Sequence, residues 1–430
     1  MPAADALAIN GGTPVISKTF PPYRSLGEEE IAAANRVLRS GVLSAFIGAS
    51  GPGFYGGPEV QALEREAAER FDVKHVVSVN SWTSGLVAAM GAIGLEPGDE
   101  VIVTPWTMVA TATAILHWNA IPVFADIDPQ TFNIDPEAVE AAITPRTRAI
   151  AAVDIFGQSA DIPALRAIAD RNGCKLVTDT AQAPGALLNG IPAGTAADIG
   201  GFSLNYHKHI HCGEGGLLVT NDDRLAERLR LIRNHGEAVI ASDQCEDLAN
   251  ILGHNFRLGE IEAAIAREQL PKLSGLIKSR QQAAARLTKA LSCLPGLNPP
   301  KVRPDSTHVY YIYGMTIDLE RLRRDRDWIV KALKAEGVSG LLEGYQNIHL
   351  NPLFRHRIAY GTSGFPWTGL RSGDSDISYG PGLCPVAEQL HQQTFIGLNL
   401  CAHAFTDDQV DAVIYAFKKV WADLSKVALR

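Results

Sequence analysis

The chain has 430 residues, of which 46% are hydrophobic and 20% are charged; its formal net charge is −8 and its pI is near 5.9. An acidic chain without a basic block is not expected to bind nucleic acid or an anionic membrane surface. No run approaches the roughly 18 apolar residues of a membrane span, and the first residues lack the pattern of a signal peptide. The six cysteines are scattered without a CxxC pair, which favours free thiols in a reducing, cytoplasmic compartment.

Residues 1–57 are expected to form an N-terminal arm that ends in a loop near the substrate, because Ser44–Gly57 is rich in glycine, serine and aromatic residues. Short apolar runs then predict six strands: Val76–Val79, Glu100–Thr104, Ile121–Phe124, Ala149–Val153, Lys175–Thr178 and Gly215–Thr220. Amphipathic stretches between them predict four helices: Ser84–Ile93, Ala110–Leu116, Pro136–Ile143 and Ala164–Asn172. This alternation indicates an α/β fold with a mostly parallel sheet covered on both faces, whose ligand site lies at the carboxyl ends of the strands.

A proline-rich stretch, Pro295–Ser306, follows a long helical region that begins near Arg224. Proline and glycine clusters of this kind mark breaks between structural units. We therefore expect a large domain over residues 58–295 and a smaller C-terminal α/β domain over residues 296–430. An amphipathic helix over Asp407–Leu424, capped at Thr406, is expected to close the smaller domain.

Lys208 lies in the stretch Asp198–Thr220, between a strand end and a glycine-rich turn, and His207, His209 and His211 surround it. Cationic neighbours disfavour the ammonium form and lower a lysine's pKa, as a nucleophilic lysine requires. The alternative is a solvated lysine beside a zinc site, because three histidines with a spacing of two on a strand share one face. This stretch alone leaves both interpretations open.

Asp179 ends a predicted strand, and Gln182 follows it three residues later. Pyridoxal phosphate (PLP) needs a carboxylate beside its pyridine nitrogen and a donor near its phenolic oxygen. An aspartate at a strand end with an amide three residues on meets both needs. The alternative is an aspartate that only caps the following turn.

The turn VNSWTSGL, residues 79–86, connects a predicted strand to a predicted helix. Amides and hydroxyls at a helix N-terminus favour a bound phosphate. Many helices start in this way, so the turn alone is weak evidence for a phosphate site.

Taken together, these residues resemble the DegT–StrS family of sugar and aminocyclitol aminotransferases over about residues 8–420. The hallmark of that family is a serine followed by a lysine and a Gly-Glu-Gly-Gly element, and here Ser203 precedes Lys208 and Gly213–Gly216. Further matching stretches are AINGGTPV (8–15), PGDEVIVTPWTMVATA (97–112), PVFADIDPQTFNIDP (122–136), AITPRTRAI (142–150) and GHNFRLGEIEAAI (253–265).

The resemblance implies a fold type I PLP-dependent transferase and assigns roles to individual residues. Lys208 would hold the cofactor as an imine, Asp179 would pair with the pyridine nitrogen, and Gln182 would contact the ring oxygen. The phosphate would be held by Ser203 and by the turn formed by Trp82, Thr83 and Ser84. Asn255 would reach the phosphate in the neighbouring subunit, which implies a homodimer with shared active sites.

The chain also departs from the family pattern. Met108 stands where an aromatic residue often covers the ring, and Trp106 is an alternative cover two residues earlier. Asp154 replaces a histidine, and Trp82 replaces a glycine in the phosphate turn. The family often contacts substrate at four positions of the smaller domain, each of which has a structural interpretation as well: Tyr311, Tyr313, Tyr345 and His349. Arg257 would meet an anion or form a structural ion pair.

The resemblance implies transamination in two halves, in which glutamate or glutamine donates an amino group to a keto-sugar, nucleotide keto-sugar or keto-cyclitol. Lys208 would shuttle the proton. Three alternatives stay open. They are a PLP-dependent sugar dehydratase, in which histidine replaces the lysine, a non-catalytic PLP-binding regulator, and a zinc protein built on the three histidines.

Overall fold

The computed structural model of the protein describes residues 6–238, 249–370 and 373–428. Its centre is a seven-stranded sheet in the order β1-β9-β8-β5-β4-β2-β3. The strands are β1 (His75–Val79), β2 (Glu100–Val103), β3 (Ile121–Phe124), β4 (Thr147–Val153), β5 (Lys175–Asp179), β8 (Ile199–Ser203) and β9 (Gly216–Thr220). Only β9 runs antiparallel to its neighbours, so the expected mostly parallel sheet is confirmed.

All six strands expected from the sequence are present, but β8 is an additional one. Its sequence, Ile199-Gly-Gly-Phe-Ser203, lacks the run of β-branched residues that marks a strand. A Cβ on Gly200 would lie 1.9 Å from the carbonyl oxygen of Gly194. Close approach of the two backbones therefore requires glycine here. Because of these glycines, a search for short apolar runs does not detect the strand.

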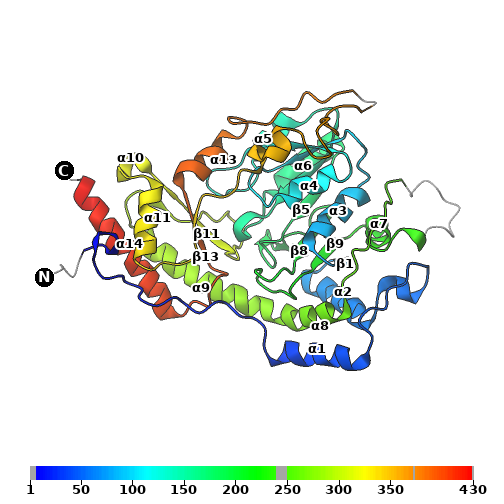
Figure 1. Ribbon diagram of the computed structural model, residues 1–430, viewed down its shortest axis with the longest axis horizontal. Coiled ribbons are helices and arrows are strands. Elements are labelled where there is room, and N and C mark those ends of the chain that lie inside the picture. The colour runs from blue at the N-terminus through cyan, green and yellow to red at the C-terminus, as the bar shows by residue number, and fades with distance from the viewer. Residues whose placement is uncertain (1–5, 239–248, 371–372, 429–430) are drawn as a thin grey trace.

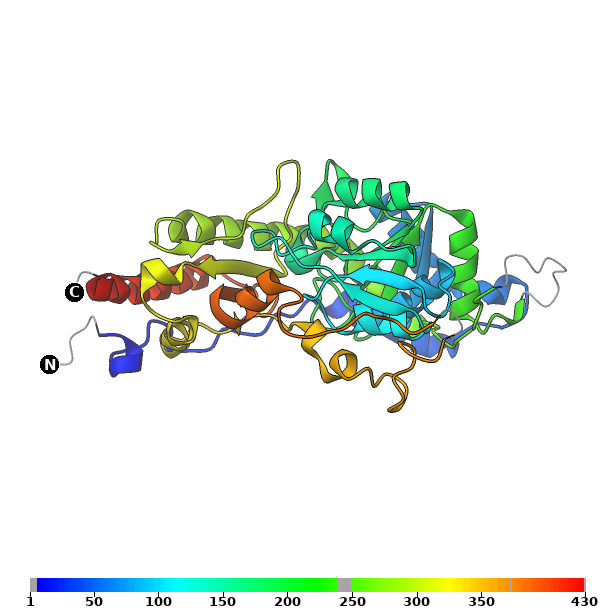
Figure 2. The same ribbon diagram turned by 90° about the horizontal axis from the view of Figure 1, so that it is seen from above.

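Helices cover both faces of this sheet (Figures 1 and 2). One face packs against α3 (Trp82–Ala92), α4 (Ala110–Leu116) and α7 (Asp223–Arg233). The other packs against α2 (Pro58–Phe71), α5 (Pro136–Ala142), α6 (Ile162–Asn172) and α8 (Glu260–Gln269). The four helices expected from the sequence all form, with boundaries within two residues of those expected.

A second, antiparallel sheet lies beside the first, with the order β10-β11-β13-β12. It consists of β10 (Leu297–Asn298), β11 (Ile312–Ile317), β12 (Leu341–Glu343) and β13 (Phe395–Asn399). Its core includes side chains of α9 (Leu273–Leu291), α11 (Arg326–Ala335) and α14 (Asp407–Ala428). Because Ile312 and Phe395 also join the core of the large sheet, the two sheets share packed side chains. A domain boundary at residue 295 stays a prediction.

Two further observations concern the chain as a whole. None of the described helices is long and apolar enough to cross a membrane. Five cysteines are free thiols, and Cys245 lies outside the described residues.

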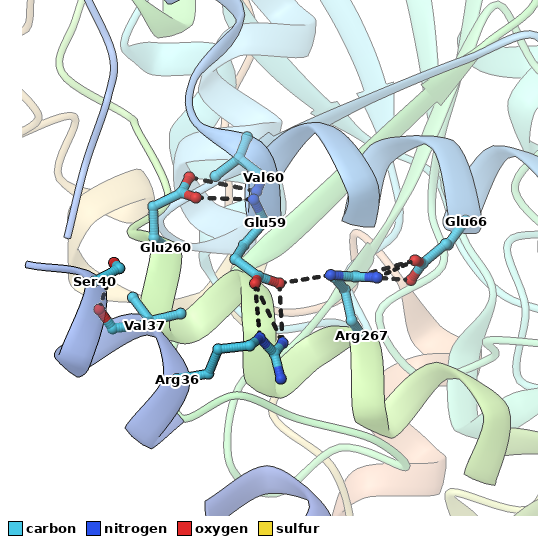
Figure 3. Close-up of polar contacts among 8 residues, drawn as sticks. All are labelled: Arg36, Val37, Ser40, Glu59, Val60, Glu66, Glu260 and Arg267. Atoms are coloured by element: carbon cyan, nitrogen blue, oxygen red, sulfur yellow. Dashed lines mark hydrogen bonds and ion pairs between the residues drawn. The ribbon is translucent and has the colours of Figure 1, made fainter. Parts of the chain in front are cut away.

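The N-terminal arm contains α1 (Glu28–Ser40), which packs along α8. Figure 3 shows the charged side chains that tie α1, α2 and α8 together. Glu59 of α2 receives Arg36 of α1 at 3.2 Å and Arg267 of α8 at 2.6 Å, and Arg267 also pairs with Glu66 at 2.6 Å. One arginine of α8 thus links two acidic residues of α2, and through Glu59 it reaches the arm.

Glu260, the first residue of α8, supplies the N-cap that α2 lacks. The residue before α2 is Gly57, which has no side chain to accept a hydrogen bond. The carboxylate of Glu260 accepts from the backbone N–H of Glu59 at 2.8 Å and of Val60 at 3.4 Å (Figure 3). A Cβ on Gly57 would lie 2.6 Å from that carboxylate, so glycine makes the approach possible.

We expect Glu260→Ala to lower the free energy of unfolding by about 1–2 kcal/mol, because it leaves two amides of α2 without a partner. Urea unfolding of the variant and wild type measures the effect. Glu268→Ala, on the same helix, is the control and should change it by less than about 0.5 kcal/mol. An equal effect of both substitutions would contradict a capping role for Glu260.

Candidate active site

A cavity of about 300 Å3 opens at the carboxyl ends of β4, β5 and β8. Seven of the nine expected cofactor contacts line it: Trp82, Thr83, Met108, Asp179, Gln182, Ser203 and Lys208. The fold therefore brings together residues that lie up to 126 positions apart in the chain, from Trp82 to Lys208. Of the other two expected cofactor contacts, Ser84 lies beside the cavity on α3, and the exposed Asn255 accepts at its backbone carbonyl oxygen from the side chain of Asn80 at 3.3 Å, next to the start of the same turn.

Asp179 ends β5 and is 5% exposed. Its Oδ1 accepts a hydrogen bond from the indole Nε1 of Trp82 at 2.7 Å and from the backbone N–H of Ala181 at 3.2 Å. Its Oδ2 accepts from the hydroxyl of Thr111 at 2.8 Å. The sequence indicated neither donor, because Trp82 and Thr111 meet Asp179 only through the tertiary packing of α3 and α4 on the sheet.

Lys208 is 8% exposed, and its Nζ lies 4.8 Å from the ring centroid of Tyr311. Burial lowers the pKa of Lys208, and the nearby carboxylate of Asp179 opposes that shift. A larger share of the amine is therefore neutral than for a solvated lysine, as a nucleophilic amine requires.

The three histidines around Lys208 point to different surroundings. His207 lines the cavity, whereas His209 is fully buried and its Nε2 lies 3.0 Å from the carbonyl oxygen of Val309. Burial lowers the pKa of His207 to about 4, so this ring is neutral near pH 7. Among the described residues, no group of three or more histidine, cysteine or acidic side chains converges on a metal position. The zinc alternative therefore lacks the ligand set it requires.

The turn before α3 is built as a helix N-terminus. Ser81 is the N-cap; its hydroxyl accepts from the backbone N–H of Ser84 at 3.1 Å and lies 2.9 Å from the Ser84 hydroxyl. Ser203 at the end of β8 lines the same cavity. A lysine amine, a buried carboxylate and donors at a helix N-terminus are the groups that PLP needs, so the cavity fits this cofactor.

The backbone and the side chain of Trp82 lie in different parts of the site. Its indole turns away from the phosphate turn and toward Asp179. Only its backbone, at the first residue of α3, belongs to the phosphate turn. The reason is the space left by neighbouring glycines, such as Gly85 and Gly201, where a Cβ would lie 2.7 and 2.3 Å from the indole ring.

Gln182 connects the cavity to the smaller sheet's side of the molecule. Its Oε1 accepts from the backbone N–H of Phe156 at 2.9 Å, and its Nε2 donates to the hydroxyl of Tyr345 at 3.2 Å. Tyr345 and Tyr311, the neighbour of Lys208, are thus beside the site.

Three other expected contacts are in structural positions. The hydroxyl of Tyr313 lies 2.8 Å from that of Thr288 in the core of the second sheet. His349 is buried and pairs with Glu388 at 3.0 Å. Arg257 donates to the side chain of Asn234 at 2.8 Å. None of these three residues lines the cavity described above.

Met108 and Trp106 were alternative covers for the cofactor ring. Met108 lines the cavity and is 62% exposed. Trp106 is fully buried, and its Nε1 donates to Asn347 at 2.6 Å. Of the two, Met108 is therefore the side chain that borders the cavity.

Asp154 ends up next to Asp179 without touching the cavity. Its carboxylate accepts from the backbone N–H of Ala160 at 2.8 Å and from the hydroxyl of Thr180 at 2.6 Å. Complete burial, assisted by the charge of Asp179 and opposed by the hydrogen bonds from Thr180 and Ala160, raises the pKa of Asp154 to about 6. The two adjacent carboxylates thus differ in their surroundings, because Asp179 accepts from three donors and borders the cavity.

This fold, with a buried lysine and carboxylate in a cavity at the strand ends, defines a fold type I PLP-dependent enzyme. Residues 25–370 match the DegT/DnrJ/EryC1/StrS aminotransferase family. The spore coat polysaccharide biosynthesis protein SpsC of Bacillus subtilis (strain 168) is 35% identical over 355 residues, which cover 81% of this chain and 88% of that protein.

An L-glutamine:2-deoxy-scyllo-inosose aminotransferase of Streptomyces kanamyceticus is 37% identical over 371 residues, covering 83% of this chain and 85% of that enzyme. The crystal structure of S. venezuelae DesV, in complex with a ketimine intermediate, is 33% identical with a TM-score of 0.75, covering 92% of this chain and 95% of that one. The chain belongs to the DegT/DnrJ/EryC1/StrS family and is a PLP-dependent aminotransferase.

Asp154→Asn is expected to stabilise the protein at pH 8 and to have less effect near pH 4. The folded pKa of Asp154 is above the unfolded value of about 3.9, so its favourable contribution exists at low pH and is lost as pH rises through about 6. The ionised carboxylate then costs up to about 3 kcal/mol, which asparagine avoids while still accepting from Ala160. Urea unfolding at both pH values measures this, and a gain independent of pH would contradict it.

Proposed function

We propose that the protein transfers the amino group of glutamine or glutamate to a ketone carbon of a sugar or cyclitol. The main support for this proposal is that Lys208 and Asp179 line the same cavity. The chain is also 37% identical to an L-glutamine:2-deoxy-scyllo-inosose aminotransferase. PLP, when bound, supplies a ring that takes up the electron pair released at the substrate carbon.

Lys208 is the proton carrier in this proposal. Its amine is buried, so a part of the lysine population is neutral. A neutral amine would accept a proton from the α-carbon of the amino donor and release that proton again later in the same half-reaction. Asp179 keeps a negative charge beside the pyridine nitrogen. The indole N–H of Trp82 and the hydroxyl of Thr111 both donate to that carboxylate and hold it in place. Gln182 offers its amide to the phenolic oxygen.

The position of Lys208 also bears on the dehydratase alternative, in which a histidine stands in place of the lysine. His209 is fully buried and its Nε2–H donates to the carbonyl oxygen of Val309 at 3.0 Å, so its ring is not available to the cavity. His207 borders the cavity, but Lys208 is the side chain whose amine lies beside Tyr311 and near Asp179. This arrangement favours amino transfer.

In the test, L-glutamine or L-glutamate is added to the PLP-loaded protein without an acceptor. The wild type is expected to lose the visible absorbance of the lysine-bound cofactor and to release the keto acid. Lys208→Ala should lack that absorbance and lose about 10⁴-fold or more in turnover, since no other group carries the proton. His207→Gln is the control for the neighbouring position and should retain the absorbance. Full turnover of Lys208→Ala would refute the assignment.

We further infer a homodimer whose partner completes each site. Asn255 is exposed and does not line its own chain's cavity, whose rim residue Met108 is 62% exposed. The arm adds large exposed apolar side chains: Ile31, Leu38, Val42, Leu43 and Ile47 are between 46% and 60% exposed. Exposed apolar groups of this number support an interface between subunits.

Mixing subunits tests the shared site. Lys208→Ala and Asn255→Ala are each expected to be impaired alone, but a mixed dimer would contain one intact site. Random exchange should then restore about a quarter of wild-type activity, since half the dimers are mixed and half their sites are intact. Lys208→Ala mixed with Asp179→Asn is the control, because both residues belong to one chain's cavity. Restoration in neither mixture would contradict the shared site.

A further inference from the structure

The indole of Trp82 is held in a fixed place under the cavity. Trp82 is 6% exposed and packs against the strands β8 and β9. A Cβ on Gly85 would come within 2.7 Å of the indole, and one on Gly216 within 3.0 Å of the Trp82 backbone. At Gly201 a Cβ would meet both the indole and the carbonyl oxygen of Leu217 at 2.3 Å. Close contacts with both strands therefore hold the ring on this side of the cavity.

From this position the Nε1–H of Trp82 is directed at Oδ1 of Asp179, 2.7 Å away. Both side chains are buried, and hydrogen bonds to a charged acceptor in such surroundings are short and strong. The backbone N–H of Ala181 shares Oδ1, and the hydroxyl of Thr111 occupies one side of Oδ2. The carboxylate plane is thus set by three donors, and Oδ2 retains accepting capacity for a further partner.

We propose that Trp82 is a positioning residue: its indole N–H fixes the orientation of the Asp179 carboxylate that pairs with the pyridine nitrogen of PLP. This inference rests on the proposed role of Asp179. A carboxylate that is 5% exposed needs such donors, because burying a charged group without hydrogen bonds is costly. The rigid indole supplies a donor that costs no rearrangement when the cofactor binds.

Trp82→Phe removes the N–H and keeps most of the buried ring. Trp118→Phe is a matched control, because Trp118 is also buried, 5% exposed, and its Nε1 donates at 2.8 Å to the carbonyl oxygen of Val87 in the same helix α3. Both variants lose one buried indole hydrogen bond. Only the Trp82 bond reaches Asp179.

The measurement is the affinity of each apoenzyme for PLP between pH 5 and 9, followed by the absorbance of the bound cofactor. Trp82→Phe should bind PLP about tenfold more weakly at pH 7.5, as expected for one lost hydrogen bond to a charged group. The pH midpoint of its affinity should also differ from that of wild type, because the carboxylate facing the pyridine nitrogen has lost one of its three donors. Trp118→Phe should match wild type in both respects.

A Trp82→Phe protein with the affinity and pH midpoint of Trp118→Phe would overturn the proposal. Should Trp82→Phe not fold, Trp82→Phe/Gly85→Ala refills part of the space beside the lost ring, and the same two outcomes apply. Asp179→Asn distinguishes a failure of the role proposed for Asp179 from a failure of the role proposed for Trp82. If it binds PLP as wild type does, the role of Asp179 fails; if only the Trp82 variants behave as wild type, that role stands and the inference about Trp82 fails.

Discussion

The organisation of the cavity follows from a carboxylate buried at the end of the central strand β5. A charge in that place is costly unless hydrogen-bond donors and a cation surround it. Asp179 has three donors, from Trp82, Thr111 and Ala181, and the amine of Lys208 is near enough to be influenced by its charge. Strand order explains how they meet, because β5 lies between β4 and β8 and faces α3 and α4.

The sequence was most informative where a side chain's role follows from local position. Asp179 at a strand end, Lys208 before a glycine-rich turn and the alternation of strands and helices could all be read from neighbouring residues. Strand β8 could not, because its glycines are required by contacts with residues outside the strand. The bonds from Trp82 and Thr111 to Asp179 span 97 and 68 residues, and no local pattern specifies such a pairing.

The histidines next to Lys208 illustrate the same limit. Their regular spacing suggested one common face, but the segment is a succession of turns and not a strand, so the rings diverge. His209 reaches Val309, 100 residues later, and so links the lysine's loop to the segment that leads into the second sheet. The positive charge expected of His207 is also absent near neutral pH. Burial lowers the pKa of this ring by more than the negative charge of Glu214 raises it. Desolvation, and not a cationic cluster, is what lowers the pKa of Lys208.

The close fit between Trp82 and Gly85 has a consequence for how this enzyme can change over time. The Cβ of an alanine at position 85 would clash with the indole carbons of Trp82, and a larger side chain would clash more severely. A substitution at position 85 is therefore acceptable only after Trp82 has been replaced, whereas loss of Trp82 alone leaves a void beside a glycine. The two positions form an epistatic pair, so the order in which mutations arise decides which descendants of this active site are accessible.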